Sequence, residues 1–205
     1  MASSKIHICN VALAALGAES IRSFDENNKR ARMCDVFYES MKEYMLGRFD
    51  WPFARGYKKL QPLDQDSIDV PPGMTAWAVP SDCAVVRDLM PPGSADRWSV
   101  SGNILYCQKG VSDNVYITYT RLDADVGMFS GTFALALSYG IASRICAVIT
   151  QDKKLGATLE TQFQTELYNA MEVGANEGND YRAYDDDPNN DTFVNPPGSV
   201  SSIYE

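Results

Sequence analysis

Two carboxylates one helical turn apart, Glu39 and Glu43, are the arrangement in this sequence closest to a catalytic pair. In glycoside hydrolysis one carboxyl group protonates the leaving oxygen, while a second acts as base or nucleophile. The residues around the pair, however, have the pattern of an amphipathic helix, whose solvent-facing side commonly carries such carboxylates. We therefore interpret the pair as a solvated helix face and keep carboxylate-based hydrolysis as the alternative.

Nucleophilic and metal-dependent chemistry finds little support in the other residues. His7 is the only histidine, so a Ser-His-Asp or Cys-His mechanism would have to use it, and no nucleophile motif lies beside it. The sequence contains no HExxH, EF-hand or phosphate-binding glycine loop. We interpret the run Asp185–Asp187 as solvated charge rather than a ligand set. The expectation is a protein with no catalytic residues, no metal and no cofactor.

The five cysteines include no CxxC pair, and their odd number argues against a disulfide framework. Buried, reduced thiols are the better interpretation. The N-terminal residues also lack a basic segment followed by an apolar stretch and a cleavage site. We therefore expect the chain to remain in the cytoplasm where it is made.

The charge of the chain indicates whether it could bind nucleic acid tightly. The net charge is −9, of which residues 177–205 contribute −6 (seven acids and one arginine), leaving −3 for the rest of the chain. No stripe of Lys and Arg provides the phosphate-neutralising surface that tight nucleic-acid binders need. If the protein meets DNA, we expect it not to bind the duplex tightly or specifically.

Any functional residues must be positioned by the long apolar run Phe133–Val148, which predicts a central helix. Its apolar residues lie on several sides, so other helices should surround it. Ala134, Ser138 and Ala142 share one face and would permit close helix packing. A membrane span is the rival interpretation, but the run is shorter than about 18 residues and contains Arg144.

Three further helices are expected around it. The first spans roughly Lys5–Leu16, and the second starts at a capping box, Ser23–Glu26, and ends near Gly47. The third spans about Lys153–Val173, with Asp152 as its N-cap. The aromatic segment Phe49–Phe53 is predicted to plug the helical core rather than to bind a ligand.

Between these helices the pattern changes to paired prolines and short β-branched or aromatic runs, which predict antiparallel strands. Ser101-Gly102-Asn103 is expected to form a hairpin turn. Alternation in the last strand predicts one buried face, formed by Val115, Ile117 and Tyr119. The expected strands are Met74–Val79, Ala84–Leu89, Arg97–Val100, Ile104–Gln108 and Val115–Thr120.

Residues 179–205 are rich in Asn, Asp and Pro, and predict an extended or disordered acidic tail. The tail nevertheless carries aromatic and branched side chains that a solubilising segment does not need. We predict that these side chains anchor it to a partner. They are Tyr181, Tyr184, Phe193, Val194, Ile203 and Tyr204.

The predicted fold class is therefore α+β: a helical bundle of about four helices with an inserted small antiparallel β subdomain and a C-terminal tail. Residues 1–54 and 122–178 would form the bundle, and residues 55–121 the β subdomain.

An ordered set of local motifs resembles the head-to-tail adaptor family (tail tubular protein A) of short-tailed bacteriophages. The set spans most of residues 5–150, and one departure from it is Met74–Ala78, where a more tyrosine-rich segment is expected. The motifs are Ile8-Cys9-Asn10, Ala12-Leu13, Leu16-Gly17, Ala31, Cys34, Phe37-Tyr38, Trp51-Pro52-Phe53-Ala54, Val79-Pro80-Ser81-Asp82-Cys83, Tyr119-Thr120-Arg121-Leu122-Asp123, Phe129 and Phe133-Ala134-Leu135-Ala136.

The resemblance implies a structural virion protein without enzyme activity. About twelve copies would form a ring between the portal protein and the tail nozzle (tail tubular protein B), assembled in the host cytoplasm, with genomic DNA passing through the lumen and no membrane contact. The rivals are a tail-associated peptidoglycan hydrolase that uses carboxylates and a simple cytoplasmic binding module.

Overall fold

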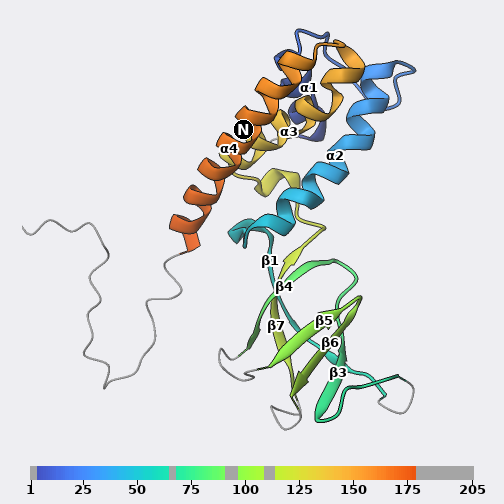
Figure 1. Ribbon diagram of the computed structural model, residues 1–205, viewed down its shortest axis with the longest axis vertical. Coiled ribbons are helices and arrows are strands. Elements are labelled where there is room, and N and C mark those ends of the chain that lie inside the picture. Colours follow the sequence, from blue (N-terminus) through green and yellow to red (C-terminus); the bar gives the residue numbers. More distant parts are fainter. Residues whose placement is uncertain (1–3, 65–67, 91–96, 109–113, 179–205) are drawn as a thin grey trace, which may run out of the picture.

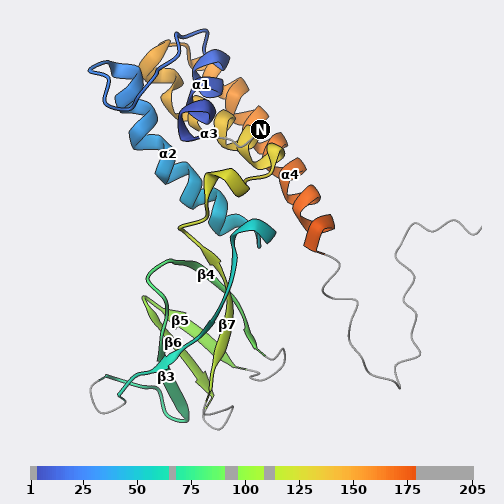
Figure 2. The same cartoon turned by 180° about the vertical axis from the view of Figure 1, so that it is seen from behind.

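A computed structural model describes residues 4–64, 68–90, 97–108 and 114–178. It contains four α-helices and two antiparallel sheets, so the α+β class is confirmed. The helices occupy one end of an elongated molecule, and the strands occupy the other (Figure 1). Figure 2 shows the same separation from behind.

The helix α3, Gly131–Ile149, is the centre of the helical end. It contacts the other three helices, and Phe133, Leu137, Ile141 and Ile145 on it are fully buried. Its partners are α1 (Lys5–Ala15), α2 (Lys29–Arg48) and α4 (Lys153–Gly178).

Packing around α3 is tight at Gly140. A Cβ atom there would lie 2.6 Å from the Met41 Cε of α2 and 3.1 Å from the Phe163 ring of α4. A glycine at this position lets both neighbours approach the backbone of α3.

The expectation that α3 is surrounded on all sides is only partly correct, because Leu135 is 38% exposed. By length and composition, α3 would qualify as a membrane-crossing helix, and among the described residues it alone does so. Its burial by three other helices is what a core helix shows.

Side-chain caps explain where the helices begin. Ser130 Oγ accepts from the Phe133 N–H, and Asp152 Oδ1 accepts from the N–H groups of Lys154 and Leu155, as predicted for the last helix. That helix ends at Gly178, five residues beyond the predicted end.

The predicted start of α2 was wrong. Glu26 does accept from the backbone N–H of Ser23, as in a capping box, but no helix follows. Asn28 is the N-cap instead, since its Oδ1 accepts from the Ala31 N–H at 2.8 Å. Ser23 Oγ is used locally, accepting from the Asp25 N–H.

The aromatic segment Phe49–Phe53 plugs the helical core, as predicted. Trp51 is buried, and its indole N–H donates to the Met45 carbonyl at 2.7 Å. The ring centroids of Trp51 and Phe53 lie 4.8 and 4.9 Å from that of Phe133. Edge-to-face contacts of this kind add to the apolar burial.

The strands form two sheets with a separate core cluster. The orders are β1-β7-β4 and β2-β3-β6-β5, and every pairing is antiparallel. The strands are β1 (Arg55–Lys59), β2 (Gln61–Pro62), β3 (Met74–Ala78), β4 (Cys83–Met90), β5 (Trp98–Ser101), β6 (Ile104–Gln108) and β7 (Tyr116–Arg121). Val86, Leu89 and Ile117 of the first sheet share their core with Trp77 and Leu105 of the second.

The five predicted strands are present with shifts of one residue at most at each end, and the β5–β6 hairpin turns at Gly102, whose φ is 60°. Two strands were missed, β1 and β2. The expectation of a single buried face on β7 is also incorrect. Ile117 and Tyr119 are buried on one face, and Thr118 and Thr120 are buried on the other.

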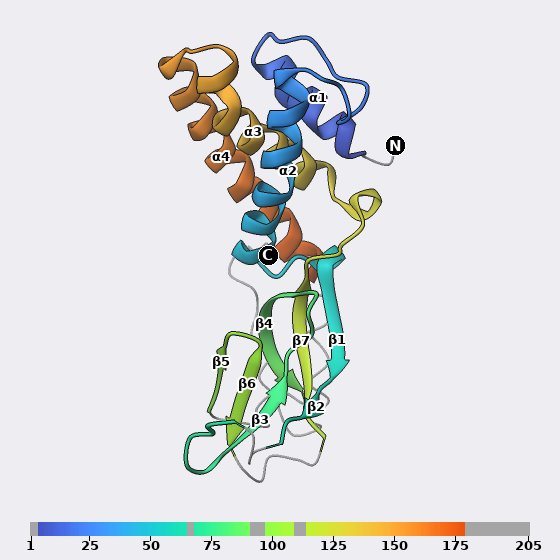
Figure 3. The ribbon, with the colours of Figure 1, turned by 90° about the vertical axis from the view of Figure 1, so that its right-hand side faces the viewer.

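Arg87 explains the second buried face of β7, because it joins the strands to the helices. From β4, its Nε donates to Thr120 Oγ1 at 2.8 Å. One terminal nitrogen donates to the carbonyls of Leu46 (3.0 Å), Gly47 (3.4 Å) and Phe49 (2.6 Å) at the end of α2. These carbonyls include groups that the helix itself leaves unpaired, and a cation is favourable there. Figure 3 shows the end of α2 lying above β4 and β7.

The first prediction concerns the core of α3. Ile141→Ala and Ile145→Ala should each lower the free energy of unfolding by about 2 to 5 kcal/mol, because both side chains are fully buried. Urea unfolding monitored by circular dichroism measures this. A midpoint unchanged from wild type in both variants would contradict it.

The second prediction concerns Arg87. Arg87→Met should cost about 2 to 4 kcal/mol, because it leaves buried carbonyls without donors. Arg87→Lys should give an intermediate loss, since an ammonium lacks the planar fork. Arg32→Met, on the exposed side of α2, is the matched control. Equal unfolding midpoints for Arg87→Met and this control would contradict the prediction.

Candidate interaction surfaces

The predicted anchors lie outside the described residues. These are Tyr181, Tyr184, Phe193, Val194, Ile203 and Tyr204, all beyond Gly178. Their role therefore stays a prediction, and candidate surfaces must be sought on residues 4–178.

The carboxylate Glu39 lies between two lysines. Its Oε1 contacts Lys5 Nζ and its Oε2 contacts Lys42 Nζ, each at 2.5 Å. Partial burial opposes ionisation, but the hydrogen bonds and charges of Lys42 and Lys5 prevail and lower the pKa of Glu39. A general acid in glycoside hydrolysis needs the opposite shift, a raised pKa. Glu43 is exposed on the same helix.

His7 is exposed on α1, beside a groove of about 220 Å³ that also contacts Ser138 of α3. The Ser138 hydroxyl donates to the Ala134 carbonyl at 2.9 Å, within its own helix. It is therefore not positioned as a nucleophile activated by His7. Within residues 4–178 as described, no group of three or more His, Cys, Asp or Glu side chains could hold a metal.

The five cysteines are free thiols, as expected, and four of them are buried. Sequence reasoning treated them as isolated, but Cys9 of α1 and Cys34 of α2 are close enough for their thiols to interact. The neighbouring Cys34 thiol and burial raise the pKa of Cys9, so it stays protonated and unreactive.

Exposed aromatic side chains occur on both ends of the molecule, and sequence reasoning did not single them out. On the helical end, Tyr168 of α4 is 71% exposed beside a groove that Arg48 of α2 also lines. On the strand end, Tyr57 and Tyr116 are exposed and lie on the same face of β1 and β7, since their strands pair. Aromatic side chains are enriched in protein interfaces.

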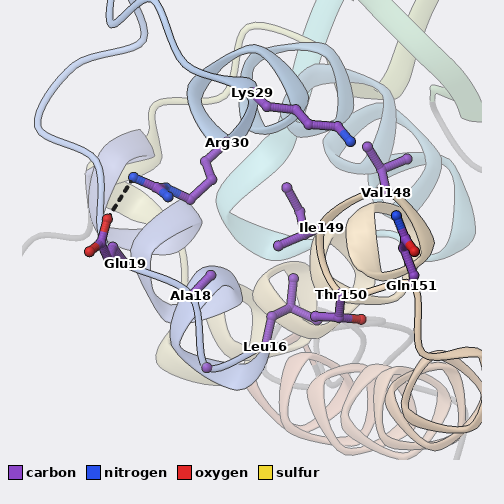
Figure 4. Close-up of a pocket in the computed structure, with 10 residues that line it drawn as sticks. Leu16, Ala18, Glu19, Lys29, Arg30, Val148, Ile149, Thr150 and Gln151 are labelled. Atoms are coloured by element: carbon purple, nitrogen blue, oxygen red, sulfur yellow. Dashed lines mark hydrogen bonds and ion pairs between the residues drawn. The ribbon is translucent and has the colours of Figure 1, made fainter.

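A pocket lies at the end of the helices farthest from the strands. It has a volume of about 520 Å³, within the range of ligand-binding pockets. The turns after α1 and α3 and the start of α2 form it. Its apolar floor consists of Leu16, Ala18, Val148 and Ile149, as Figure 4 shows.

The rim of this pocket is basic. Figure 4 shows Lys29 extending across the opening towards Val148, and Arg30 pointing towards Glu19. Arg30 pairs with Glu19 at 2.9 Å, but the Glu19 side chain is 84% exposed, so the pair is screened by solvent and weak. The Arg30 Nε is buried without a hydrogen-bond partner in the described structure. Lys29 has no ion-pair or hydrogen-bond partner among the described side chains.

The turns that shape the pocket have special backbone geometry. Gln151, on its lining, has a φ of 58°, which is uncommon for a residue other than glycine. Gly17, on the opposite turn, has a φ of 65°. Gly17 is an ordinary glycine helix end, whereas the conformation of Gln151 persists only because the surrounding structure fixes it.

This geometry suits the binding of an anionic group with an apolar side chain. Unpaired donors at the rim attract carboxylates, and the apolar floor accepts a ring or branched side chain. Sequence reasoning missed the pocket because three segments distant in sequence form it. The local signal that could have indicated it is the basic run Lys29–Arg32 at the start of α2, where acidic residues are normally favoured.

A search of protein-family profiles found no family that matches this chain, and a search of curated proteins found no significant relative.

Proposed function

We propose that this protein is a structural virion component, a head-to-tail adaptor that forms a ring between the portal and the tail nozzle of a short-tailed bacteriophage. The proposal rests on the resemblance of the motifs quoted above. The observation that carries it further is that motifs distant in sequence meet in space, in two groups.

The first group lies in the helical core. Trp51 and Phe53, from the Trp-Pro-Phe-Ala motif, pack against Phe129 and Phe133 from the motifs about 75 residues later. The four rings form one cluster, with Phe129 and Phe133 centroids 4.8 Å apart. Because the four rings pack against one another, the motifs that carry them are expected to occur together in one sequence.

The second group lies where the strands meet the helices. The Tyr119 hydroxyl donates to Asp82 Oδ2 at 3.1 Å, and the Leu122 N–H donates to the Asp82 carbonyl at 2.7 Å. Burial and the hydrogen bond to Asp82 raise the pKa of Tyr119 to about 12, so the hydroxyl remains a donor. The Val-Pro-Ser-Asp-Cys and Tyr-Thr-Arg-Leu-Asp motifs thus act together.

In this proposal residues 1–54 and 122–178 form the helical bundle, residues 55–121 form an inserted β subdomain, and residues 179–205 form an acidic tail. The separate core clusters of helices and strands support such a division. Twelve or so subunits would enclose the DNA, and the net charge of −9 suits a lumen that does not retain the duplex.

The alternative is a tail-associated peptidoglycan hydrolase. The lowered pKa of Glu39 argues against it as a general acid, which leaves Glu43 as the available member of the pair. Incubation with purified peptidoglycan, followed by chromatography of released fragments, tests this alternative. A cytoplasmic binding module, the third possibility, would not assemble with portal rings.

The decisive experiment is electron microscopy of the protein mixed with the portal of its own phage. We expect an added ring on one face of the portal. Portal rings that remain bare at saturating concentrations of the protein would contradict the proposed function.

The third prediction concerns the tail. Truncation after Gly178 should leave the thermal midpoint of the isolated subunit nearly unchanged, because the helical core cluster ends at Met171. It should severely weaken ring assembly on the portal, since ordering a segment costs about 1 to 2 kcal/mol per residue and only buried anchors offset this. A full-length chain with serine at all six anchors is the control for length and charge. Truncated protein that assembles as well as wild type would contradict the prediction.

A further inference from the structure

We propose that the pocket rimmed by Lys29 and Arg30 binds the acidic segment Tyr181–Asp187 of a second copy of this chain. The inference deepens the proposed function, because a ring places copies side by side, and it names the contact that would link neighbours. It requires neither the portal nor the nozzle.

The pocket offers what such a segment needs. Lys29 is exposed at the rim without a partner among the described residues, and the Arg30 side chain beside it is partly exposed. The Arg30–Glu19 pair is exposed, so an incoming carboxylate can replace Glu19 at little cost. The adjoining segment Asp152–Lys154 adds two further cations and one anion.

The segment has the complementary chemistry. Its sequence is Tyr-Arg-Ala-Tyr-Asp-Asp-Asp, with three consecutive carboxylates directly after Tyr184. We place the Tyr184 ring on the apolar floor of Leu16, Ala18 and Val148, and the carboxylates of Asp185–Asp187 against the basic rim. Charge-assisted hydrogen bonds of this type are stronger than neutral ones, and three consecutive carboxylates can engage Lys29 and Arg30 together.

Chain length identifies the occupant as a second copy. The pocket lies at the beginning of α4, whereas the tail leaves from its end. The 26 residues of α4 span about 39 Å at 1.5 Å per residue. Tyr184 follows Gly178 by six residues, which reach at most about 21 Å. The segment therefore falls well short of the pocket of its own chain.

The fourth prediction uses isotopes to separate the two cases. Equal amounts of full-length ¹⁴N- and ¹⁵N-labelled protein are mixed and treated with a carbodiimide, which joins a carboxylate directly to an amine. We expect mixed-isotope cross-links between Asp185–Asp187 and Lys29, detected by mass spectrometry, that disappear at high salt. Lys29→Arg should abolish these cross-links while keeping self-association, because it keeps the charge and removes the amine.

Charge reversal tests whether the ionic contact between tail and pocket stabilises self-association. The pocket variant Lys29→Glu/Arg30→Glu and the tail variant Asp185→Lys/Asp186→Lys/Asp187→Lys should each weaken self-association at least about tenfold in sedimentation velocity. A mixture of the two variants should restore it, since each tail then faces a pocket of opposite charge. Lys58→Glu/Lys59→Glu on β1 makes the same charge change as the pocket variant and should leave association unchanged.

Rescue by mixing rules out misfolding as the cause of the losses. The proposal is overturned by cross-links confined to single-isotope species, by a failure of the mixture to recover, or by the absence of mixed-isotope cross-links both in concentrated protein and with the portal. If copies cross-link but do not bind the portal, the proposed adaptor function is wrong and the contact between tail and pocket is supported. If rings bind the portal without the cross-link, the adaptor function is supported and the contact is wrong.

Discussion

The contact on which the rest of the structure depends is the one that Arg87 makes between the strands and α2. The chain crosses from the helices to the strands near Phe49 and crosses back near Arg121. These two connecting segments, which we call passages, must stay side by side for the helical core to pack. Arg87 holds the first passage through the Phe49 carbonyl and the second through Thr120. Burial lowers the pKa of Arg87, but an arginine remains charged, and the carbonyls around it replace the water it has lost. A guanidinium serves here because its fork reaches several acceptors at once.

The basic groups of this protein fall into two kinds, those satisfied within the fold and those left available. Arg87 binds carbonyls, Arg55 pairs with Asp50, and Lys5 and Lys42 share Glu39. Lys29 lacks such a partner among the described residues, and Arg30 has only an exposed one. Lys29 is not alone in this, because the side chains of Lys58, Lys59, Lys153 and Lys154 also make no ion pair among the described residues. Lys29 and Arg30 differ from the cations on β1 in lining an apolar pocket, where ionic and apolar contacts can combine in one site.

The sequence predicted most of the fold because hydrophobic periodicity and capping residues act locally. Helices around Phe133 and Leu155 and the hairpin at Gly102 follow from such signals. The strand β1 was missed because Arg-Gly-Tyr-Lys-Lys lacks an apolar alternation, and its pairing with β7 supplies the order instead. The false start at Ser23 shows the converse, since a capping pattern formed its hydrogen bond to Glu26 without a helix. The pocket lay beyond local reasoning, because Leu16, Lys29 and Ile149 meet only after the helices pack.

The proposed ring around DNA would face a conflict that the proposed use of the pocket resolves. Subunits need strong contacts with their neighbours, and ionic contacts supply both strength and register, yet cations exposed to the lumen would hold the duplex by its phosphates. If the carboxylates of one copy cover Lys29 and Arg30 of the next, those cations are neutralised by the assembly itself. The cations then stabilise the ring and do not act on DNA. The acidic character of the C-terminal segment is then explained by its complementarity to the pocket, and not by solubility alone.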